Sequence, residues 1–470
     1  GPPKSLRSAL SLLTDALRLT AAEISLEQGL DFFNIFLAPF IKGLSRKEIK
    51  ENISLFLSSV NLTVPTGVSL GIETSIPRFL MDSRAFGPRE REKRVYGDFT
   101  DESLILASII LECLKESIKH QTIFNPSVIV KIRPKSLHDS DSEGLLYLAH
   151  ELAVHGLPYF ANLLQESQEY ASYTVRGLRF TADWKEDWEI DTIRTGCMDQ
   201  VIVNLPRAAY ESDKEEENFF ENLQDFVEKG LETLRIKHQT MKDRMDEGLL
   251  PFLLQKEIGD HYFRIENSSS ILSFVGLNES VQFMTGGSIQ EDPDSLSFAE
   301  KVVLHLTDRI DEYSKKRGIR INLGLPHNFE AAKRLAQLDI ERYGLGTVLT
   351  QGERENPYYT NLNVVPHHRE MPLEDYLNIE SRFHRLASGS HLAKVSLDED
   401  ETSPEEIMSI TKRIIHEYTI GLYTYDRPLT YCNSCRKTWH GEKMKCPACG
   451  SVNTLIRFKR ESARYRARGT

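Results

Sequence analysis

The sequence predicts an α/β fold, because segments with helical patterning alternate with single short runs of β-branched residues. The clearest of these runs are residues 127–132 and 200–205, and helical segments of about ten to twenty residues separate such strands. A sheet of this kind can stay open or close into a barrel, and the spacing of the segments does not decide between the two. The chain has 470 residues, which is enough for a large core or for two to three ordinary domains.

Capping signals and apolar patterning place the elements in order. Ser45 with Glu48, and Ser297 with Glu300, have the spacing of a capping box, and Ser403 is followed by a proline and two acids. Each of these patterns predicts the start of a helix. The predicted elements are helices at 46–60, 101–118 and 142–164, strands at 127–132 and 200–205, long surface helices over 211–245, a helix from 298 to about 316 that ends at Gly318, a strand at 319–323, and a helix from 404 toward 421.

Composition excludes several classes of protein. Hydrophobic residues make up 40% and charged residues 27% of the chain, which is typical of a globular protein. The longest apolar stretch, 104–111, is far shorter than the roughly 20 residues that a membrane span needs. We therefore expect no membrane segment and, because no secretory signal precedes the first helix, a cytoplasmic protein.

The charge of the chain changes sign at its C-terminal end. The net charge is −11, which argues against wrapping of nucleic acid, but residues 457–470 contain six basic residues and one acid. This basic tail is interpreted either as a solvated segment or as a patch for phosphates, nucleic acid or an acidic partner.

Four of the six cysteines form two CxxC pairs separated by ten residues. Each pair aims two thiolates at one point, and four thiolates in a tetrahedral shell suit a structural Zn²⁺ ion. The spacing therefore predicts a zinc ribbon in a reducing compartment, with the metal ligands Cys432, Cys435, Cys446 and Cys449.

Six short segments precede the ribbon in the order that one enzyme family has. They are Asn34-Ile-Phe-Leu-Ala-Pro-Phe40, Val95-Tyr-Gly-Asp-Phe99, Arg194-Thr-Gly-Cys197, Asn204-Leu-Pro-Arg207, Phe274-Val-Gly-Leu-Asn-Glu279 and Tyr358-Tyr-Thr-Asn361. Together with the ribbon, they resemble the anaerobic (class III, glycyl-radical) ribonucleoside-triphosphate reductases over nearly the whole chain.

The resemblance implies an architecture and a reaction. It implies a ten-stranded α/β barrel over residues 1–425, the ribbon over 426–456, and a tail, 457–470, that corresponds to the glycyl-radical segment. It also implies a homodimer that binds a ribonucleotide in the barrel and reduces it to a deoxyribonucleotide. In that family a radical-SAM activase makes a glycyl radical, which then makes a thiyl radical on a loop cysteine.

Two positions depart from that radical chemistry. Ala463 takes the place of the radical glycine, and its side chain crowds a planar radical and shields the hydrogen that an activase must remove. The loop cysteine is expected near residues 175–178, where the sequence has none. Cys197, the nearest cysteine along the chain, is either a radical or redox thiol or an ordinary buried thiol, and Cys113 is expected in the core.

Polar residues that follow predicted strands are the candidates for a nucleotide site. Asn204 and Asn278 are candidate nucleotide ligands, and Glu279 is a candidate proton donor or acceptor for a ribose hydroxyl. The alternative is that Asn278 caps a helix whose first turn contains Glu279. Gly286 and Gly287 either present amides to phosphate at a helix start or form a turn.

Three functions remain compatible with these observations. The chain is a reductase, a reductase-like barrel that binds nucleotides without the chemistry, or a zinc-ribbon adaptor whose basic tail contacts nucleic acid. The missing loop cysteine and the alanine at 463 favour the second over the first.

Overall fold

The computed structural model describes residues 2–88, 94–120, 123–165, 168–257, 260–366, 371–389, 391–397 and 402–458. It divides into two compact units. Unit 1 comprises Gly1–Glu169, Lys394–Arg413 and Tyr423–Thr470, and unit 2 comprises Tyr170–Ala393 and Ile414–Leu422. The predicted α/β class is confirmed, because both units combine a sheet that contains parallel strands with helices.

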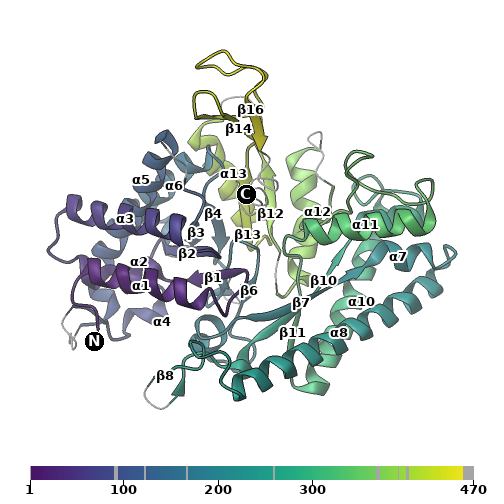
Figure 1. The fold of residues 1–470 in the computed structure, drawn as a ribbon, viewed down its shortest axis with the longest axis horizontal. Helices are drawn as coiled ribbons and strands as arrows, with labels where there is room; N and C mark the ends of the chain where they lie inside the picture. Colours follow the sequence, from purple (N-terminus) through teal and green to yellow (C-terminus); the bar gives the residue numbers. More distant parts are fainter. Residues whose placement is uncertain are drawn as a thin grey trace. The chain divides into compact units, whose positions relative to one another are not determined.

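Unit 1 is built around a six-stranded sheet with the strand order β1-β2-β3-β4-β13-β12. The first four strands pair in parallel, and helices connect them along the chain (Figure 1). The strands are β1 (Glu27–Leu30), β2 (Gly67–Glu73), β3 (Ser127–Ile132), β4 (Tyr159–Asn162), β12 (Ala393–Ser396) and β13 (Leu422–Asp426). The helices are α1 (Leu6–Thr20), α2 (Phe33–Ile41), α3 (Arg46–Thr63), α4 (Arg78–Met81), α5 (Thr100–His120), α6 (Ser140–Ala153) and α13 (Pro404–Glu417).

The core of unit 1 lies between these helices and the parallel strands. Helix α5 supplies Leu106 and Ile110, which have no exposed surface, and β3 supplies Val130, which is equally buried. The predicted capping box at the start of α3 is confirmed: the Glu48 amide donates to the Ser45 hydroxyl, and the Ser45 amide donates to the Glu48 carboxylate at 2.9 Å.

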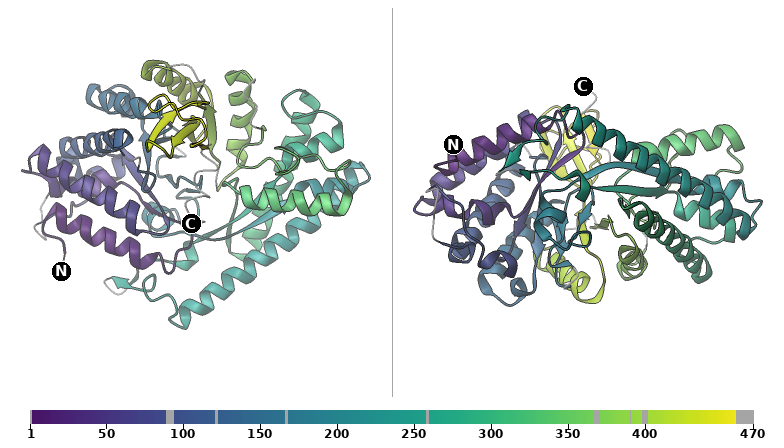
Figure 2. Two further views of the ribbon diagram at one scale, coloured as in Figure 1. Left: turned by 45° about the horizontal axis from the view of Figure 1, so that its top comes forward. Right: turned by 90° about the horizontal axis from the view of Figure 1, so that it is seen from below.

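Unit 2 contains a three-stranded parallel sheet with the order β11-β10-β7. Two long helices, α8 and α10, pack on this sheet and on each other (Figure 2). The strands of unit 2 are β5 (Ser172–Tyr173), β6 (Arg179–Phe180), β7 (Cys197–Asn204), β8 (Lys256–Glu257), β9 (Asp260–His261), β10 (Ser269–Val275) and β11 (Arg320–Leu323). Its helices are α7 (Leu205–Tyr210), α8 (Glu216–Asp246), α9 (Leu277–Thr285), α10 (Pro293–Arg317), α11 (Phe329–Tyr343) and α12 (Leu373–Leu386).

The ribbon is a small antiparallel sheet within unit 1. Its strands are β14 (Leu429–Cys432), β15 (Lys437–His440) and β16 (Leu455–Phe458), in the order β15-β14-β16. The predicted ribbon region therefore folds as a three-stranded element with cysteines at the end of β14 and in its loops.

Two predicted helix boundaries were wrong. The helix expected at 142–164 ends at Ala153, because Gly156 with a φ of +75° and then Pro158 break it before β4 begins. The helix expected from the Ser297 capping box begins at Pro293 instead, where the Asp292 side chain accepts from the Ser295 amide. Its predicted end at Gly318 is confirmed, with a φ of +65° at that glycine.

No helix among the described segments is both long enough and apolar enough to cross a membrane.

Candidate functional site

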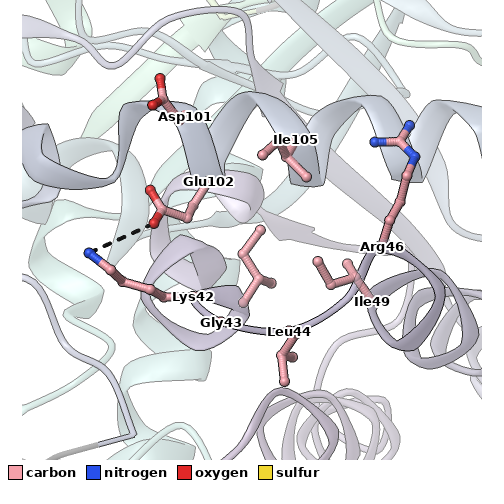
Figure 3. Close-up of a pocket in the computed structure, with 9 residues that line it drawn as sticks. Lys42, Gly43, Leu44, Arg46, Ile49, Asp101, Glu102 and Ile105 are labelled. Atoms are coloured by element: carbon pink, nitrogen blue, oxygen red, sulfur yellow. Dashed lines mark ion pairs between the residues drawn. The ribbon is translucent and has the colours of Figure 1, made fainter.

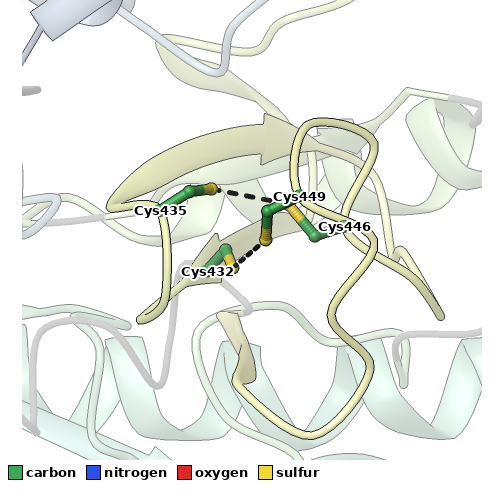
Figure 4. Close-up of side chains that lie close together, drawn as sticks. All are labelled: Cys432, Cys435, Cys446 and Cys449. Carbon is green, nitrogen blue, oxygen red and sulfur yellow. Dashed lines mark hydrogen bonds between the residues drawn. The ribbon is translucent and has the colours of Figure 1, made fainter.

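The four ribbon cysteines converge on one point (Figure 4). Cys432 Sγ lies 3.6 Å from Cys449 Sγ, and Cys435 Sγ lies 3.5 Å from Cys446 Sγ. These separations are much longer than the roughly 2 Å of a disulfide bond. They are close to the about 3.8 Å expected between thiolates that share one tetrahedral ion at about 2.3 Å. The predicted ligands are therefore brought together in a cluster that can hold one metal ion.

Local hydrogen bonds prepare two of these thiols for deprotonation. The Thr454 hydroxyl and the Cys435 amide lower the pKa of Cys432 to about 6. The Cys449 amide lowers the pKa of Cys446, whereas desolvation raises the pKa of Cys435 to about 12. The hydrogen bonds therefore favour the thiolate form of Cys432 and Cys446, one from each CxxC pair. A bound cation favours deprotonation of a thiol ligand in general.

The segment where the family's loop cysteine was expected forms the tip of a tight hairpin. Strands β5 and β6 pair in antiparallel fashion, and the Thr174 amide donates to the Leu178 carbonyl at 2.9 Å. Gly177, with a φ of +93°, lets the chain reverse between them. The tip contains no sulfur, because residues 174–178 read Thr-Val-Arg-Gly-Leu.

The two cysteines outside the ribbon lie in regular elements. Cys197 is the first residue of β7, and its thiol donates to the Asp199 carbonyl at 3.4 Å. Burial raises the pKa of Cys197 to about 12, so the group is a thiol at neutral pH and a poor ionic nucleophile. Cys113 packs in α5, with its sulfur 3.3 Å from the Ser54 hydroxyl, and its expected place in the core is confirmed.

Asn204, a candidate nucleotide ligand, is engaged by other protein groups at the end of β7. Its Nδ2 donates to Asp339 Oδ2 at 2.8 Å, and its Oδ1 accepts from the Arg207 amide. Asp339 is fully buried and also accepts from Tyr359 Oη at 2.7 Å and from Arg207 Nε at 2.8 Å. Sequence reasoning missed Asp339 because its partners lie more than a hundred residues away, apart from Tyr359.

Asn278 and Glu279 lie in the first turn of α9. The alternative interpretation is confirmed for Glu279, which lies in the first turn. It was wrong for the cap, because Gly276 occupies the N-cap and Asn278 Oδ1 instead accepts from the Ile289 amide at 3.2 Å. The Glu279 carboxylate accepts from Gln351 Nε2 at 2.8 Å and from the Thr360 hydroxyl at 2.6 Å. Burial raises the pKa of Glu279, which suits a group that carries a proton.

Gly286 does not begin a helix as the phosphate-binding interpretation required. It is the C-cap of α9, with a φ of +85°. The C-terminal end of a helix presents carbonyls, which repel phosphate. Gly286 nevertheless lines a pocket of about 450 Å³ together with Lys214, Gln282 and Phe283, where Lys214 Nζ lies 5.0 Å from the centre of the Phe283 ring.

A buried charge cluster in unit 1 was also missed. Glu73 ends β2, and it pairs with Arg133 Nε at 2.6 Å and with Lys131 Nζ at 3.4 Å. Lys131 has no exposed surface and donates to Asp31 at 2.6 Å. The available signal was that charged residues stand at the end of the predicted strand 127–132, where side chains of parallel strands gather at one edge.

A second pocket, which belongs to unit 1, has a volume of about 300 Å³ and lies beside the start of α5 (Figure 3). Lys42 and Glu102, which line it, form an ion pair of 4.0 Å, and Arg46 pairs with Glu112. The two cations of this pocket therefore already have acidic partners.

Ala463 and the basic tail from 459 onward lie outside the described residues.

Comparison with solved structures shows what this fold is similar to. The chain superposes on a structure described as anaerobic ribonucleotide reductase with a TM-score of 0.79 and 17% identity, over 99% of this chain and 74% of that one. The Thermotoga maritima anaerobic ribonucleotide reductase in complex with dATP and CTP gives a TM-score of 0.77 and 17% identity, over 99% and 78%. A glycyl radical enzyme from Archaeoglobus fulgidus gives 0.51 and 11%, over 90% and 62%.

The sequence itself was compared with curated proteins and with family models. No curated protein matches it. The family model for the anaerobic ribonucleoside-triphosphate reductases matches residues 1–460, which is nearly the whole chain. The resemblance read from the short motifs is thus confirmed, and the chain belongs to the anaerobic ribonucleoside-triphosphate reductase family.

Proposed function

We propose that this member of the family binds ribonucleotides but does not form the thiyl radical that their reduction needs. The observation that carries the proposal is the hairpin tip at 174–178, which has no sulfur. All six cysteines lie elsewhere: four in the ribbon, Cys113 in α5 and Cys197 on β7.

The chemistry explains why the position of the sulfur matters. A thiyl radical abstracts a hydrogen atom from the ribose, so the sulfur must stand on a loop that reaches the sugar. The Val175 side chain at the hairpin tip offers only C–H bonds, which are stronger than S–H bonds and do not replace them. Cys197 begins strand β7 instead of lying at a loop tip, and its thiol donates to a carbonyl two residues away, which is a poor position for that role.

Nucleotide binding is supported by the fold and by the polar groups of unit 2. A family relative of the same fold is described with dATP and CTP bound. Asn204, Asn278 and Glu279 remain the proposed contacts at the strand ends, where a nucleotide would replace their present protein partners. Lys214 with Phe283 offers a cation and an aromatic face in a pocket of about 450 Å³, and the charge of Lys214 offsets the carbonyls that the C-terminal end of α9 presents there.

The remaining proposals come from the family resemblance. We propose a closed ten-stranded barrel, a homodimer, and a structural Zn²⁺ ion on the four ribbon cysteines. Elemental analysis that finds no zinc in purified protein with intact cysteines would contradict the last of these.

Calorimetry under anaerobic conditions tests the binding proposal. ATP, CTP and dATP are titrated into the wild type and into Lys214→Ala, Asn278→Ala and the control Lys47→Ala, which alters an exposed side chain of α3. We expect at least one nucleotide to bind. The variant that removes a side chain in contact with the nucleotide, Lys214→Ala or Asn278→Ala, should bind it about tenfold more weakly, which is about 1.4 kcal/mol. No heat with any nucleotide would overturn the proposal.

An activity assay tests the second part of the proposal, that the chain does not form the thiyl radical. The protein is incubated without oxygen with ribonucleoside triphosphates, a radical-SAM activase of the family, S-adenosylmethionine and a reductant, and deoxyribonucleotides are measured. We expect none, and also no glycyl radical signal by electron paramagnetic resonance, because Ala463 stands in the radical position. Deoxyribonucleotide formation that Cys197→Ser abolishes would show that the enzyme reading is right and that Cys197 is the radical thiol.

A further inference from the structure

Three side chains with metal-ligating groups meet in the interior of unit 2, far along the chain from the ribbon cysteines. They are Glu380 and His384 of α12 and His391, which follows that helix. One ligand atom from each lies within 4.8 Å of the others. We propose that Glu380, His384 and His391 form a second metal site, for a divalent first-row transition ion such as Zn²⁺.

The backbone holds these three residues in place. Glu380 and His384 are four residues apart on one helix, which puts both side chains on the same face. Arg179 then fixes Ser388 and Gly389, which follow α12: its Nε donates to the Ser388 carbonyl at 2.9 Å, and its amide donates to the Gly389 carbonyl at 2.7 Å. The Gly389 amide in turn donates to the Leu323 carbonyl of β11 at 2.8 Å.

Their burial is the main reason to expect a ligand. Glu380 is 0%, His384 5% and His391 4% exposed. Within the described part of the chain, four of their polar atoms have no hydrogen-bond partner: Glu380 Oε2, His384 Nε2, and both ring nitrogens of His391. Buried polar atoms without partners are costly, and an ion shared by three side chains would satisfy several of them at once.

The carboxylate has the arrangement of a metal ligand. Glu380 Oε1 accepts from the Val364 and Val365 amides at 3.0 and 3.1 Å, which fixes the carboxylate and leaves Oε2 to bind an ion. Oε2 lies 2.8 Å from His391 Nε2, but the two atoms are not aligned as a hydrogen bond.

Two imidazoles and one carboxylate are a donor set that suits Zn²⁺ and Fe²⁺. Three protein ligands leave one tetrahedral position for water or a small anion. Because all three side chains are buried, we assign the site a structural role: it joins α12, the segment before β12 and the 364–365 backbone.

The rings must tilt to aim at one ion. Their centres are 3.9 Å apart and their planes differ by 11°, so their in-plane lone pairs run side by side. Coordination through His384 Nε2 also places the ring proton on Nδ1, which faces the Gly421 amide at 3.4 Å. Two donors, the Nδ1 proton and the Gly421 amide proton, would then face each other. Because 3.4 Å is at the outer limit of a hydrogen bond, a small rotation of the ring separates these two donors.

Metal counting distinguishes this site from the ribbon. Full-length protein is saturated with Zn²⁺, freed of excess ion and measured by mass spectrometry of its zinc content. We expect two ions per chain in the wild type and in His416→Asn, which alters an exposed histidine of α13. One ion should remain in the double variant His384→Asn/His391→Asn, and one in Cys432→Ser/Cys435→Ser.

The coordination sphere supplies an independent readout that does not depend on folding of the histidine variant. In the cysteine variant, X-ray absorption should show ligands at about 2.0–2.1 Å from nitrogen and oxygen and none at the about 2.3 Å of sulfur. In wild-type protein loaded with two equivalents of Co²⁺, only one equivalent should give thiolate-to-cobalt charge-transfer bands. One zinc per chain in the wild type, or a second ion that persists in the histidine double variant, overturns the proposal.

Discussion

Asp339 shows how much a single buried carboxylate can organise. It accepts hydrogen bonds from Asn204, Arg207 and Tyr359, and it has no exposed surface. Asp339→Ala leaves these donors without an acceptor, so we expect a loss of about 3 kcal/mol in the free energy of unfolding, measured by chemical denaturation.

A carboxylate on the surface is the matched control for this prediction. Asp225 pairs with Lys229 on α8 and is 55% exposed at its side chain. Asp225→Ala should cost less than about 0.5 kcal/mol, because solvent screens an exposed helix pair. Equal losses in the two variants would contradict the organising role of Asp339.

Glu279 makes the stability of unit 2 depend on pH. Burial raises its pKa above the ordinary value of 4.5, so the folded state keeps the proton to higher pH than the unfolded state. The stability that this group contributes is therefore complete below pH 4.5 and is lost as the pH rises through the raised folded-state value.

Glu279→Gln removes this titration. We expect the unfolding free energy of the wild type to fall relative to that of Glu279→Gln as the pH rises above 4.5, in denaturation curves measured across that window. Parallel curves for the two proteins would show that the hydrogen bonds from Thr360 and Gln351 fully offset the burial of the charge.

Among single residues, the sequence predicted those site groups whose positions depend on local spacing along the chain. The CxxC pairs located the four-cysteine cluster, because the two members of each pair lie only three residues apart along the chain. Asp339 and the Glu380 site depend on contacts between distant segments, and only the four-residue spacing of Glu380 and His384 hinted at a shared face.

Among the elements, the turn from β10 into α9 depends on one glycine. Gly276 has a φ of +75°, and a Cβ there would lie 2.3 Å from Pro206 Cγ. Gly276→Ala should therefore destabilise the protein by about 1–3 kcal/mol from the backbone conformation alone, with the contact against the proline ring in addition. Thermal or chemical unfolding measures the change.

A helical glycine with free space around it provides the comparison. Gly144 lies in α6, and a Cβ there would meet nothing within 4 Å. Gly144→Ala should leave stability unchanged or raise it by about 0.5–1 kcal/mol, because alanine favours the helix. A loss of stability in Gly144→Ala as large as in Gly276→Ala would remove the conformational explanation.

The elements themselves were largely predictable, and their ends less so. The strand at 127–132 was predicted with its observed bounds, and the Ser45 capping box fixed the start of α3. The boundaries that were predicted wrongly depend on competing local signals. Gly156 and Pro158 end α6 earlier than predicted, and Asp292, which lies five residues before Ser297, is the N-cap of α10.

For the whole molecule, order along the chain was more informative than any one motif. Each of the six family-like segments is short, but their order from Asn34 to Asn361 matched a family that covers residues 1–460. Pairing of distant strands was not predictable, because the order β1-β2-β3-β4-β13-β12 joins segments separated by more than two hundred residues.

Ligand binding should be visible as a change in the stability of the whole protein. A nucleotide that binds only the folded state, present at a hundred times its dissociation constant, raises the free energy of unfolding by about 2.7 kcal/mol. We therefore expect the nucleotide that binds in calorimetry to shift the denaturation midpoint, and a nucleotide that gives no heat to leave it unchanged. In the variant that binds about tenfold more weakly, the same nucleotide concentration should raise the free energy of unfolding by only about 1.4 kcal/mol. Stabilisation by every nucleotide and by inorganic triphosphate alike would instead indicate a general anion effect, and the ribonucleotide site would have to be abandoned.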